Sequence, residues 1–258
     1  YSDDQINFDV SQIEVLEGGN KIIGKKRGTI TTNDGVIINA DEFEYDKIKN
    51  VLKAKGNITV NDEANKYIIN SENILYLRDQ EKIQIKGRSS SLIFSNYNFK
   101  SEDLIILRDE SILESNKPTT IIDKKNQTLY EIDKFRYFIK DEILKGNKIF
   151  INTKFNQPFS DKYFFKNGIF NLKDQSYIAK DIDINLKKDI FGNKKNDPRF
   201  KGISSSSKNG ITTIDKGIFT SCKKSDKCPP WSVQAEKITY DKNKKQVLYD
   251  SAIIKVYD

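Results

Sequence analysis

Apolar and polar residues alternate with a period of two along most of this chain. The segment VLKAKGNITV (residues 51–60) places Leu52, Ala54, Ile58 and Val60 on one face, with two lysines on the other face. Alternation of this kind, in segments rich in Ile, Val, Tyr and Phe, predicts β-strands with one buried face. Helix signals are nearly absent, so the pattern predicts an all-β protein.

A short motif recurs along the chain. A small or apolar residue is followed by a residue that is usually acidic, and then by two apolar residues one position apart. Its copies are spaced by 30, 31, 30, 31, 47 and 56 residues and begin at Val10, Ala40, Ser71, Ser101, Ile132, Ala179 and Ala235. Lys-Gly steps, as at Gly56 and Gly87, recur between the copies. Each repeat of about 30 residues therefore predicts two strands joined by a polar turn.

Seven such repeats predict about fourteen strands, which must close or stack to hide their edges. A long jelly roll and a β-solenoid both satisfy this condition. Asp34-Gly35, Asn167-Gly168 and Asn209-Gly210 predict tight hairpin turns. The wider spacings after Ile132 and Ala179 predict insertions, and the segment from Lys187 to Gly210 is the clearest predicted loop.

The repeats place one set of apolar side chains on a common face. These residues fill an ordinary core or line a groove for an apolar ligand, and alternation alone does not decide between the two. The set comprises Val10, Ile13, Val15, Phe43, Tyr45, Ile74, Tyr76, Leu104, Ile106, Phe135, Tyr137, Ile182, Ile184, Ile238 and Tyr240.

The composition of the chain limits the functions that it can have. The chain has 258 residues, a net charge of +7 and no histidine. The charge suits an anionic partner, although a lysine-rich codon bias accounts for it equally well. Without histidine, serine and cysteine nucleophiles lack their usual base, and the two cysteines cannot complete a zinc site. The repeated acids Asp41, Glu72, Glu102, Asp133 and Glu236 predict a bulge or turn rather than a site. We therefore expect no enzyme activity, metal, cofactor or nucleic-acid partner.

Both cysteines lie in FTSCKKSDKCPPWSVQAEKITYDKNKK (residues 219–245), which also holds the only tryptophan. Cys222 and Cys228 form a disulfide with each other, pair with cysteines outside this chain, or stay reduced. The chain contains no methionine, so Tyr1 is expected to begin a processed or trimmed chain, and a processed chain favours an oxidising compartment and a disulfide. Trp231 is expected to anchor the packing there.

The same segment resembles the end of the periplasmic domain of the LptD family of lipopolysaccharide-assembly proteins. Phe219, Thr220 and Cys222, then Trp231, then Ala235 and Ile238 match that family's motif. Cys228 with Pro-Pro-Trp, and DPRFKG (residues 197–202), resemble α-proteobacterial members. The upstream segment ADEFEYDKIKNVLKAKGNITV resembles the OstA-type repeat, which is shared with the bridge protein LptA.

The resemblance implies one OstA-like periplasmic domain over residues 1–258, folded as an elongated open β-jelly roll. It implies a groove that shields the acyl chains of lipopolysaccharide on their way to an outer-membrane barrel, which lies outside this chain. The implied location is the periplasmic face of the outer membrane, after removal of a signal peptide. The implied groove residues are Val10, Ile13, Phe43, Tyr45, Ile74, Tyr76, Leu104, Ile106, Phe135, Tyr137, Ile182, Ile184, Ile238 and Tyr240.

The implied partners are lipopolysaccharide, an LptA-like bridge protein, and the protein's own barrel with an LptE-like lipoprotein plug. The first strand, with Ile6, Phe8 and Val10, is the expected edge for the bridge protein, because strand edges add partners by backbone pairing. A Cys222–Cys228 bond is the expected pairing within this chain. A free-standing LptA-like bridge protein, a β-solenoid enzyme acting on polysaccharide and a surface adhesin are the alternatives.

Overall fold

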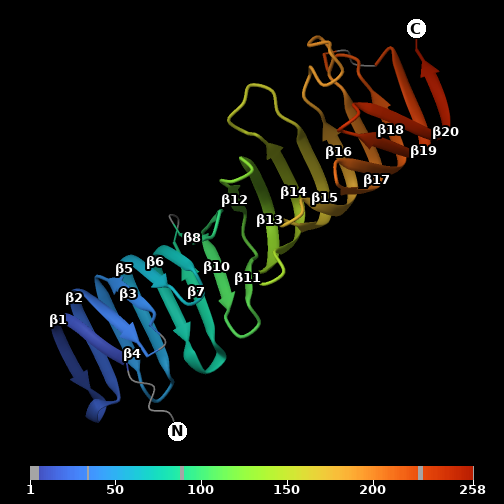
Figure 1. Cartoon of the computed structure of the whole chain (residues 1–258). Coiled ribbons are helices and arrows are strands. Elements are labelled where there is room, and N and C mark those ends of the chain that lie inside the picture. The colour runs from blue at the N-terminus through green and yellow to red at the C-terminus, as the bar shows by residue number, and fades with distance from the viewer. Residues whose placement is uncertain (1–5, 34, 88–89, 226–228, 258) are drawn as a thin grey trace. The chain divides into compact units, whose positions relative to one another are not determined.

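The computed structural model describes residues 6–33, 35–87, 90–225 and 229–257. The chain is all-β, as its alternation predicts, and divides into two compact units, residues 1–124 and residues 125–258 (Figure 1). Among the described residues, no helix is both long enough and apolar enough to cross a membrane. Each unit is an antiparallel meander of long runs, where a run is either one long strand or two short consecutive strands. Each run pairs with the run before it and the run after it.

Unit 1 holds the first twelve strands and two short 3-10 helices of the described residues. Four of its runs stay whole, and its other full-length runs are broken in two near the middle. The strands are β1 (Ile6–Leu16), β2 (Lys21–Thr32), β3 (Ile37–Ala40), β4 (Glu42–Asp46), β5 (Val51–Asp62), β6 (Tyr67–Leu77), β7 (Lys82–Lys86), β8 (Ser91–Phe94), β9 (Tyr97–Ser101), β10 (Asp103–Leu107), β11 (Ile112–Ser115) and β12 (Thr119–Asp123), and the helices are η1 (Glu17–Gly19) and η2 (Arg78–Gln80).

Unit 2 holds eight long strands in its described residues, paired in chain order. Long loops follow β14, β16 and β18, whereas short turns join the other neighbours. The strands are β13 (Thr128–Phe138), β14 (Ile143–Thr153), β15 (Lys162–Asn171), β16 (Ser176–Asn185), β17 (Arg199–Lys208), β18 (Ile211–Thr220), β19 (Trp231–Asp241) and β20 (Gln246–Val256).

The runs bend near their centres. In several of them a residue at the bend has a left-handed backbone, as in Lys26 of β2 (φ 68°), Lys148 of β14 (φ 48°) and Asp181 of β16 (φ 50°). An extra or left-handed residue in a strand forms a bulge that bends the ladder. The two halves of each run therefore lie in two half-sheets that meet at a line of bends.

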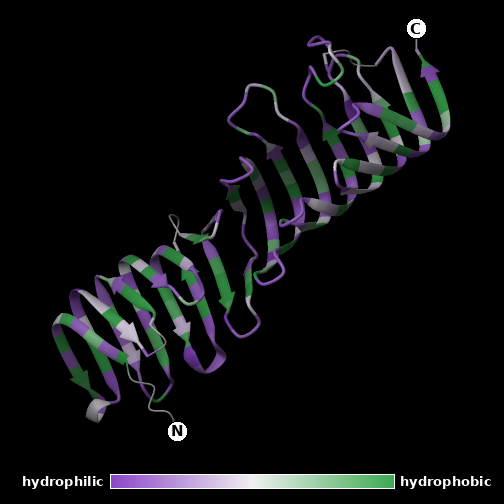
Figure 2. Cartoon of the chain, in the orientation of Figure 1, coloured by the Kyte–Doolittle hydropathy of each residue, from purple (hydrophilic) through white to green (hydrophobic). Residues whose placement is uncertain are grey.

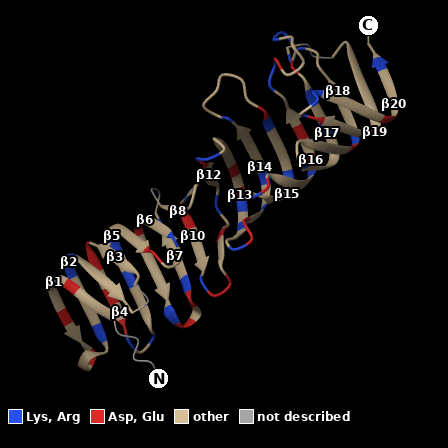
Figure 3. Ribbon diagram, in the orientation of Figure 1, with Lys and Arg blue, Asp and Glu red and all other residues tan. Residues whose placement is uncertain are grey.

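The repeated acids lie along this line, as predicted. Asp41 separates β3 from β4, and its carboxylate accepts hydrogen bonds from Arg27 (3.1 Å) and Asn57 (2.6 Å). Asp133 forms an exposed ion pair with Lys148 at 2.8 Å. Figure 3 shows acidic and basic residues interspersed along both units. Asp41 and Asp133 thus make short polar contacts at the bends, on the outer surface.

The Lys-Gly step has a steric reason at Gly56. This residue adopts φ +77°, and an added Cβ would lie 2.6 Å from Oδ2 of Asp41. We expect Gly56→Ala to lower the free energy of unfolding by about 2 kcal/mol, from backbone strain and the clash together. Gly192 is a matched control because it has φ +84° and no neighbouring atom within 4 Å. Gly192→Ala should cost about 1 kcal/mol, from strain alone. Urea unfolding measures both, and equal losses would contradict the role of the clash.

Two sequence predictions about turns are wrong. Asn167-Gly168 lies at the bend inside β15 rather than in a hairpin, and residues 199–208 of the predicted loop form β17. Asn209-Gly210 is a hairpin turn as predicted, with φ +53° and +78°, whereas Asp34 lies outside the described residues. The loop prediction holds for residues 187–198, which connect β16 and β17.

Candidate functional site

The two half-sheets of each unit face each other with their apolar sides. We call half-sheet A the one that contains residues 58–62 of β5 in unit 1 and residues 162–165 of β15 in unit 2, and half-sheet B the one that contains residues 51–55 and 167–171 of the same strands. In both halves of β5 the buried residues alternate with exposed or half-buried ones. Hydrophobic and hydrophilic positions also alternate along the strands of both units (Figure 2). Leu52, Ala54, Ile58 and Val60 are all buried, as the alternation predicts.

Ring contacts show that the two inner faces touch. Phe8 of half-sheet A lies 6.4 Å from Tyr45 of half-sheet B, measured between ring centroids. In unit 2 the corresponding distances are 5.7 Å for Phe165–Phe170 and 5.7 Å for Phe200–Tyr240. The apolar residues of the repeats are therefore packed against each other across the interior of each unit.

Most of the predicted groove residues lie in this interior. Val10 is half-buried and Ile13 is 46% exposed, because both belong to the edge strand β1. Val15, at the end of the same strand, is also exposed. The remaining predicted residues are buried: Phe43, Tyr45, Ile74, Tyr76, Leu104, Ile106, Phe135, Tyr137, Ile182, Ile184, Ile238 and Tyr240.

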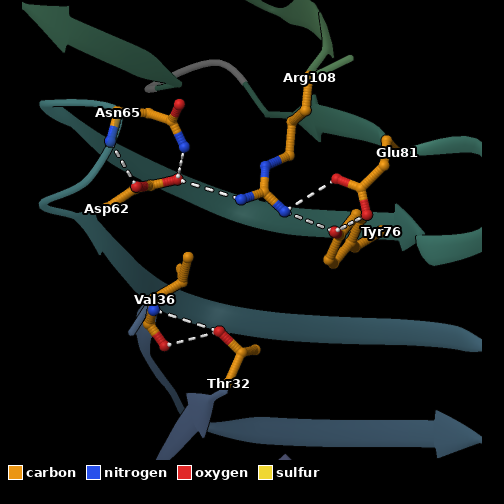
Figure 4. A network of polar contacts seen from close by, with 7 residues as sticks. All are labelled: Thr32, Val36, Asp62, Asn65, Tyr76, Glu81 and Arg108. Carbon is orange, nitrogen blue, oxygen red and sulfur yellow. Dashed lines mark hydrogen bonds and ion pairs between the residues drawn. The ribbon is translucent and has the colours of Figure 1, made fainter. Parts of the chain in front are cut away.

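Opposite the bends, the turns of half-sheet A and those of half-sheet B form two rows. We call the line between these rows the seam. In unit 1, Arg108 follows β10 in the row of half-sheet B and reaches the buried Asp62 at the end of β5 in the row of half-sheet A, with Nη2 3.6 Å from Oδ2 (Figure 4). In unit 2, Nζ of Lys242 lies 2.9 Å from Oδ2 of the buried Asp161. Each unit thus has an ion pair that crosses its seam.

The Arg108 pair belongs to a small polar network. Nη1 of Arg108 donates to the hydroxyl of Tyr76 (2.7 Å) and to Glu81 (2.9 Å), and the same tyrosine hydroxyl donates to Glu81 (2.8 Å). Asp62 accepts hydrogen bonds from the backbone and side chain of Asn65. Burial raises the pKa of Tyr76 to about 12, so its phenol stays protonated and remains a donor.

The loops of unit 2 add to its seam. All three long loops belong to the row of half-sheet A, where β14, β16 and β18 end. In the loop after β16, Ile190 is buried, and the ring of Phe191 contacts Phe219 of half-sheet A and Tyr240 of half-sheet B. The insertions therefore place apolar side chains between the two half-sheets.

Sequence reasoning missed the four ion-pair residues of the seams. Asp62 and Asp161 are 1% and 5% exposed, yet each is one acid among 37 in the sequence. The available signal was that Arg108 and Lys242 occupy the same place in two repeats, two residues after the last apolar position of the motif. That signal shows position along a strand, but it does not show which carboxylate lies opposite.

The interior of unit 2 contains a cavity of about 230 Å³ between the half-sheets at the seam. Its wall combines apolar side chains with hydroxyl groups from both half-sheets. Its lining includes Ile151, Tyr163, Phe170, Leu172, Tyr177 and Tyr240.

The first strand of unit 1 and the last strand of unit 2 are edge strands. In the part of the chain that the structure describes, β1 pairs only with β2 and β20 pairs only with β19. Both present apolar residues to solvent: Val15 and Leu16 on β1, and Ile253, Ile254 and Val256 on β20. Exposed apolar edge strands favour pairing with another strand.

Of the two cysteines, Cys222 lies among the described residues. Sγ of Cys222 lies 3.7 Å from the carbonyl oxygen of Trp231, whose ring centroid is 6.0 Å from that of Phe219. Trp231 thus packs at the end of half-sheet A, as expected. Cys228 lies outside the described residues, so the Cys222–Cys228 bond stays a prediction.

The sequence matches no protein-family model, and no curated protein matches it significantly. The resemblance to the LptD family therefore rests on the motifs quoted above.

Proposed function

We propose that this chain is a periplasmic domain that carries lipopolysaccharide toward the outer membrane. It would shield the acyl chains between its half-sheets and leave the sugars outside. The observation that carries the proposal is the apolar inner face present in every repeat of both units. Sequence motifs of the LptD type add the substrate class and the place in the cell.

The physical need for such a shield is large. Exposing a methylene group to water costs about 0.8 kcal/mol, so a chain of twelve carbons costs roughly 10 kcal/mol on the same scale. Free transit through water is therefore excluded. Shielding requires no covalent chemistry, and we propose no enzyme activity.

Access to the interior would come through the seams. Side-chain contacts such as Arg108–Asp62 and Lys242–Asp161 join the two rows of turns. Separating side chains leaves the backbone ladders of both half-sheets intact. Each unit would thus act as a jelly roll that opens along one side, with the line of bends as its closed side.

The edges suggest the partners. An LptA-like bridge protein would pair with β1 through the edge that holds Ile6, Phe8 and Val10. Beyond β20 we propose the protein's own barrel with its lipoprotein plug, because Ile254 and Val256 continue the inner face at that edge and remain exposed.

Direct binding tests the proposal. The 258-residue chain should bind lipopolysaccharide at least ten times more tightly than the same molecule stripped of its acyl chains, because the apolar interior provides the affinity. Calorimetry below the aggregation concentration of the lipid measures both affinities. A polysaccharide enzyme or an adhesin would bind the two forms alike, and that result would refute the proposal.

A further inference from the structure

Tyr240 has a buried hydroxyl group without a partner in the described part of the chain. The residue is 4% exposed, and its ring contacts Phe191 and Phe200 at centroid distances of 6.4 and 5.7 Å. These contacts hold the ring in place beside the cavity of unit 2, which Tyr240 lines. A buried hydroxyl that lacks a hydrogen bond is costly and requires an explanation.

The repeat shows how this hydroxyl differs from two of its equivalents. Tyr45 and Tyr76 occupy the same place in the motif, and each donates to the residue five positions later, Asn50 at 3.0 Å and Glu81 at 2.8 Å. Both of these acceptors have a left-handed backbone in the following turn. In the last repeat the same turn position, also left-handed, holds Lys245.

Lysine is a donor only, so it cannot accept the proton of the phenol. The nearby Asp161 is already engaged, because Oδ1 accepts the backbone N–H of Lys187 (2.9 Å) and Oδ2 accepts Nζ of Lys242 (2.9 Å). Burial raises the pKa of Tyr240, so the phenol stays protonated. It is a neutral donor that requires an external acceptor.

The cavity indicates which acceptor fits. Its volume of about 230 Å³ is several times the roughly 30 Å³ that a water molecule occupies in the liquid. Ile151, Phe170 and Leu172 supply apolar wall, and Tyr163 and Tyr177 line the cavity together with Tyr240. A ligand here must be mainly apolar and must carry an acceptor without a strong positive charge.

We propose that the hydroxyl of Tyr240 donates a hydrogen bond to the carbonyl oxygen of an ester- or amide-linked acyl chain that enters this cavity from the seam. The inference rests on the proposed function and deepens it, because it assigns the linkage between chain and sugar to one residue of unit 2. An acyl linkage matches the site because it joins an apolar chain to a single strong acceptor.

The test compares two simple amphiphiles that differ in this carbonyl. The probes are 6-O-octanoylglucose, which has an ester, and octyl glucoside, which has none, both below their micelle concentrations and with the full chain. The wild-type protein should bind the ester about 5 to 10 times more tightly, the usual range for one buried hydrogen bond. Tyr240→Phe should bind both probes alike.

Tyr76→Phe is the matched control, since its hydroxyl is satisfied by Glu81 and Arg108 within the protein. It should keep the preference for the ester and lower the Tm, whereas Tyr240→Phe should leave the Tm unchanged or raise it. Three results would overturn the inference: no ester preference in the wild type, a preference retained in Tyr240→Phe, or a clear fall in Tm for Tyr240→Phe. The last would show that the protein itself supplies a partner.

This outcome is separable from that of the proposed function. Ester preference through Tyr240 without binding of lipopolysaccharide would leave the acyl site standing and refute lipopolysaccharide as its cargo. Binding of lipopolysaccharide without ester preference would refute the role of Tyr240 alone.

Discussion

Replacing Arg108 by alanine should lower the free energy of unfolding by about 3 kcal/mol, because it leaves a buried carboxylate without its cation. Asp62 is 1% exposed and would keep its hydrogen bonds from Asn65 but no cation. The hydrogen bonds from Arg108 to Glu81 and Tyr76 would be lost as well. Urea unfolding of the variant and the wild type measures the difference.

The distances alone suggest the opposite order of importance. The exposed pair Lys148–Asp133 is closer, at 2.8 Å, than Arg108–Asp62, at 3.6 Å. Solvent screens an exposed pair, so burial rather than distance should decide the effect. Lys148→Ala is thus the matched control, and its Tm should stay near that of the wild type.

The reason for the loss can be tested in the same experiment. Adding Asp62→Asn to Arg108→Ala removes the uncompensated charge and should recover part of the stability. If Arg108→Ala is no more destabilising than Lys148→Ala, or if Asp62→Asn gives no recovery, the seam ion pair does not hold the half-sheets together in the way described.

The repeat made much of the fold predictable. Alternation identified the strands and their buried faces, as in β5, and the repeated acids identified the bends. Both signals are local, because a strand alternates and a bulge needs particular residues wherever the strand lies. Alternation could not show that the two halves of one run belong to different half-sheets, because Leu52 and Ile58 follow one alternating pattern across the bend.

The turn and loop predictions were wrong where the same local sequence pattern fits two different structures. Asn167-Gly168 suits a hairpin turn, but a bend inside a strand also uses small residues: an added Cβ at Gly168 would lie 2.6 Å from Cε2 of Phe170. The serines of residues 204–207 suggested a loop, yet Ser205 is buried in β17, on the inner face of half-sheet B. A small side chain fits there because large aromatic residues such as Tyr177 fill the space from the neighbouring strand.

The sequence predicted which side chains face the interior, but not which side chains meet across it. The pattern assigned Phe43, Ile74 and Leu104 to one side, and the structure buries all three. The seam depends on pairs far apart in sequence, such as Asp161 and Lys242, which no local pattern connects. The unpartnered hydroxyl of Tyr240 could be inferred from the repeat only after the contacts of Tyr45 and Tyr76 were known.

The second large effect concerns where lipid contacts the chain. A benzoylphenylalanine residue at Phe43 or Phe135 changes the buried side chain least in shape and places a photoreactive group between the half-sheets. Because acyl chains would occupy this interior during transport, both positions should capture lipopolysaccharide on irradiation in cells that carry the protein. Lys53 and Ile178 are matched controls, because they lie on the same two units and are exposed on the outer surface.

This crosslinking measurement is the most direct test of the central claim, that the apolar interior shields acyl chains. If acyl chains enter the interior, capture should be strong at Phe43 and Phe135 and at background level at Lys53 and Ile178, read as lipopolysaccharide-positive bands of the protein. Ile178 is 66% exposed and apolar, so it controls for nonspecific capture of lipid by exposed apolar surface. Equal capture at inner and outer positions, or capture only at the outer ones, would show that the interior does not shield the acyl chains.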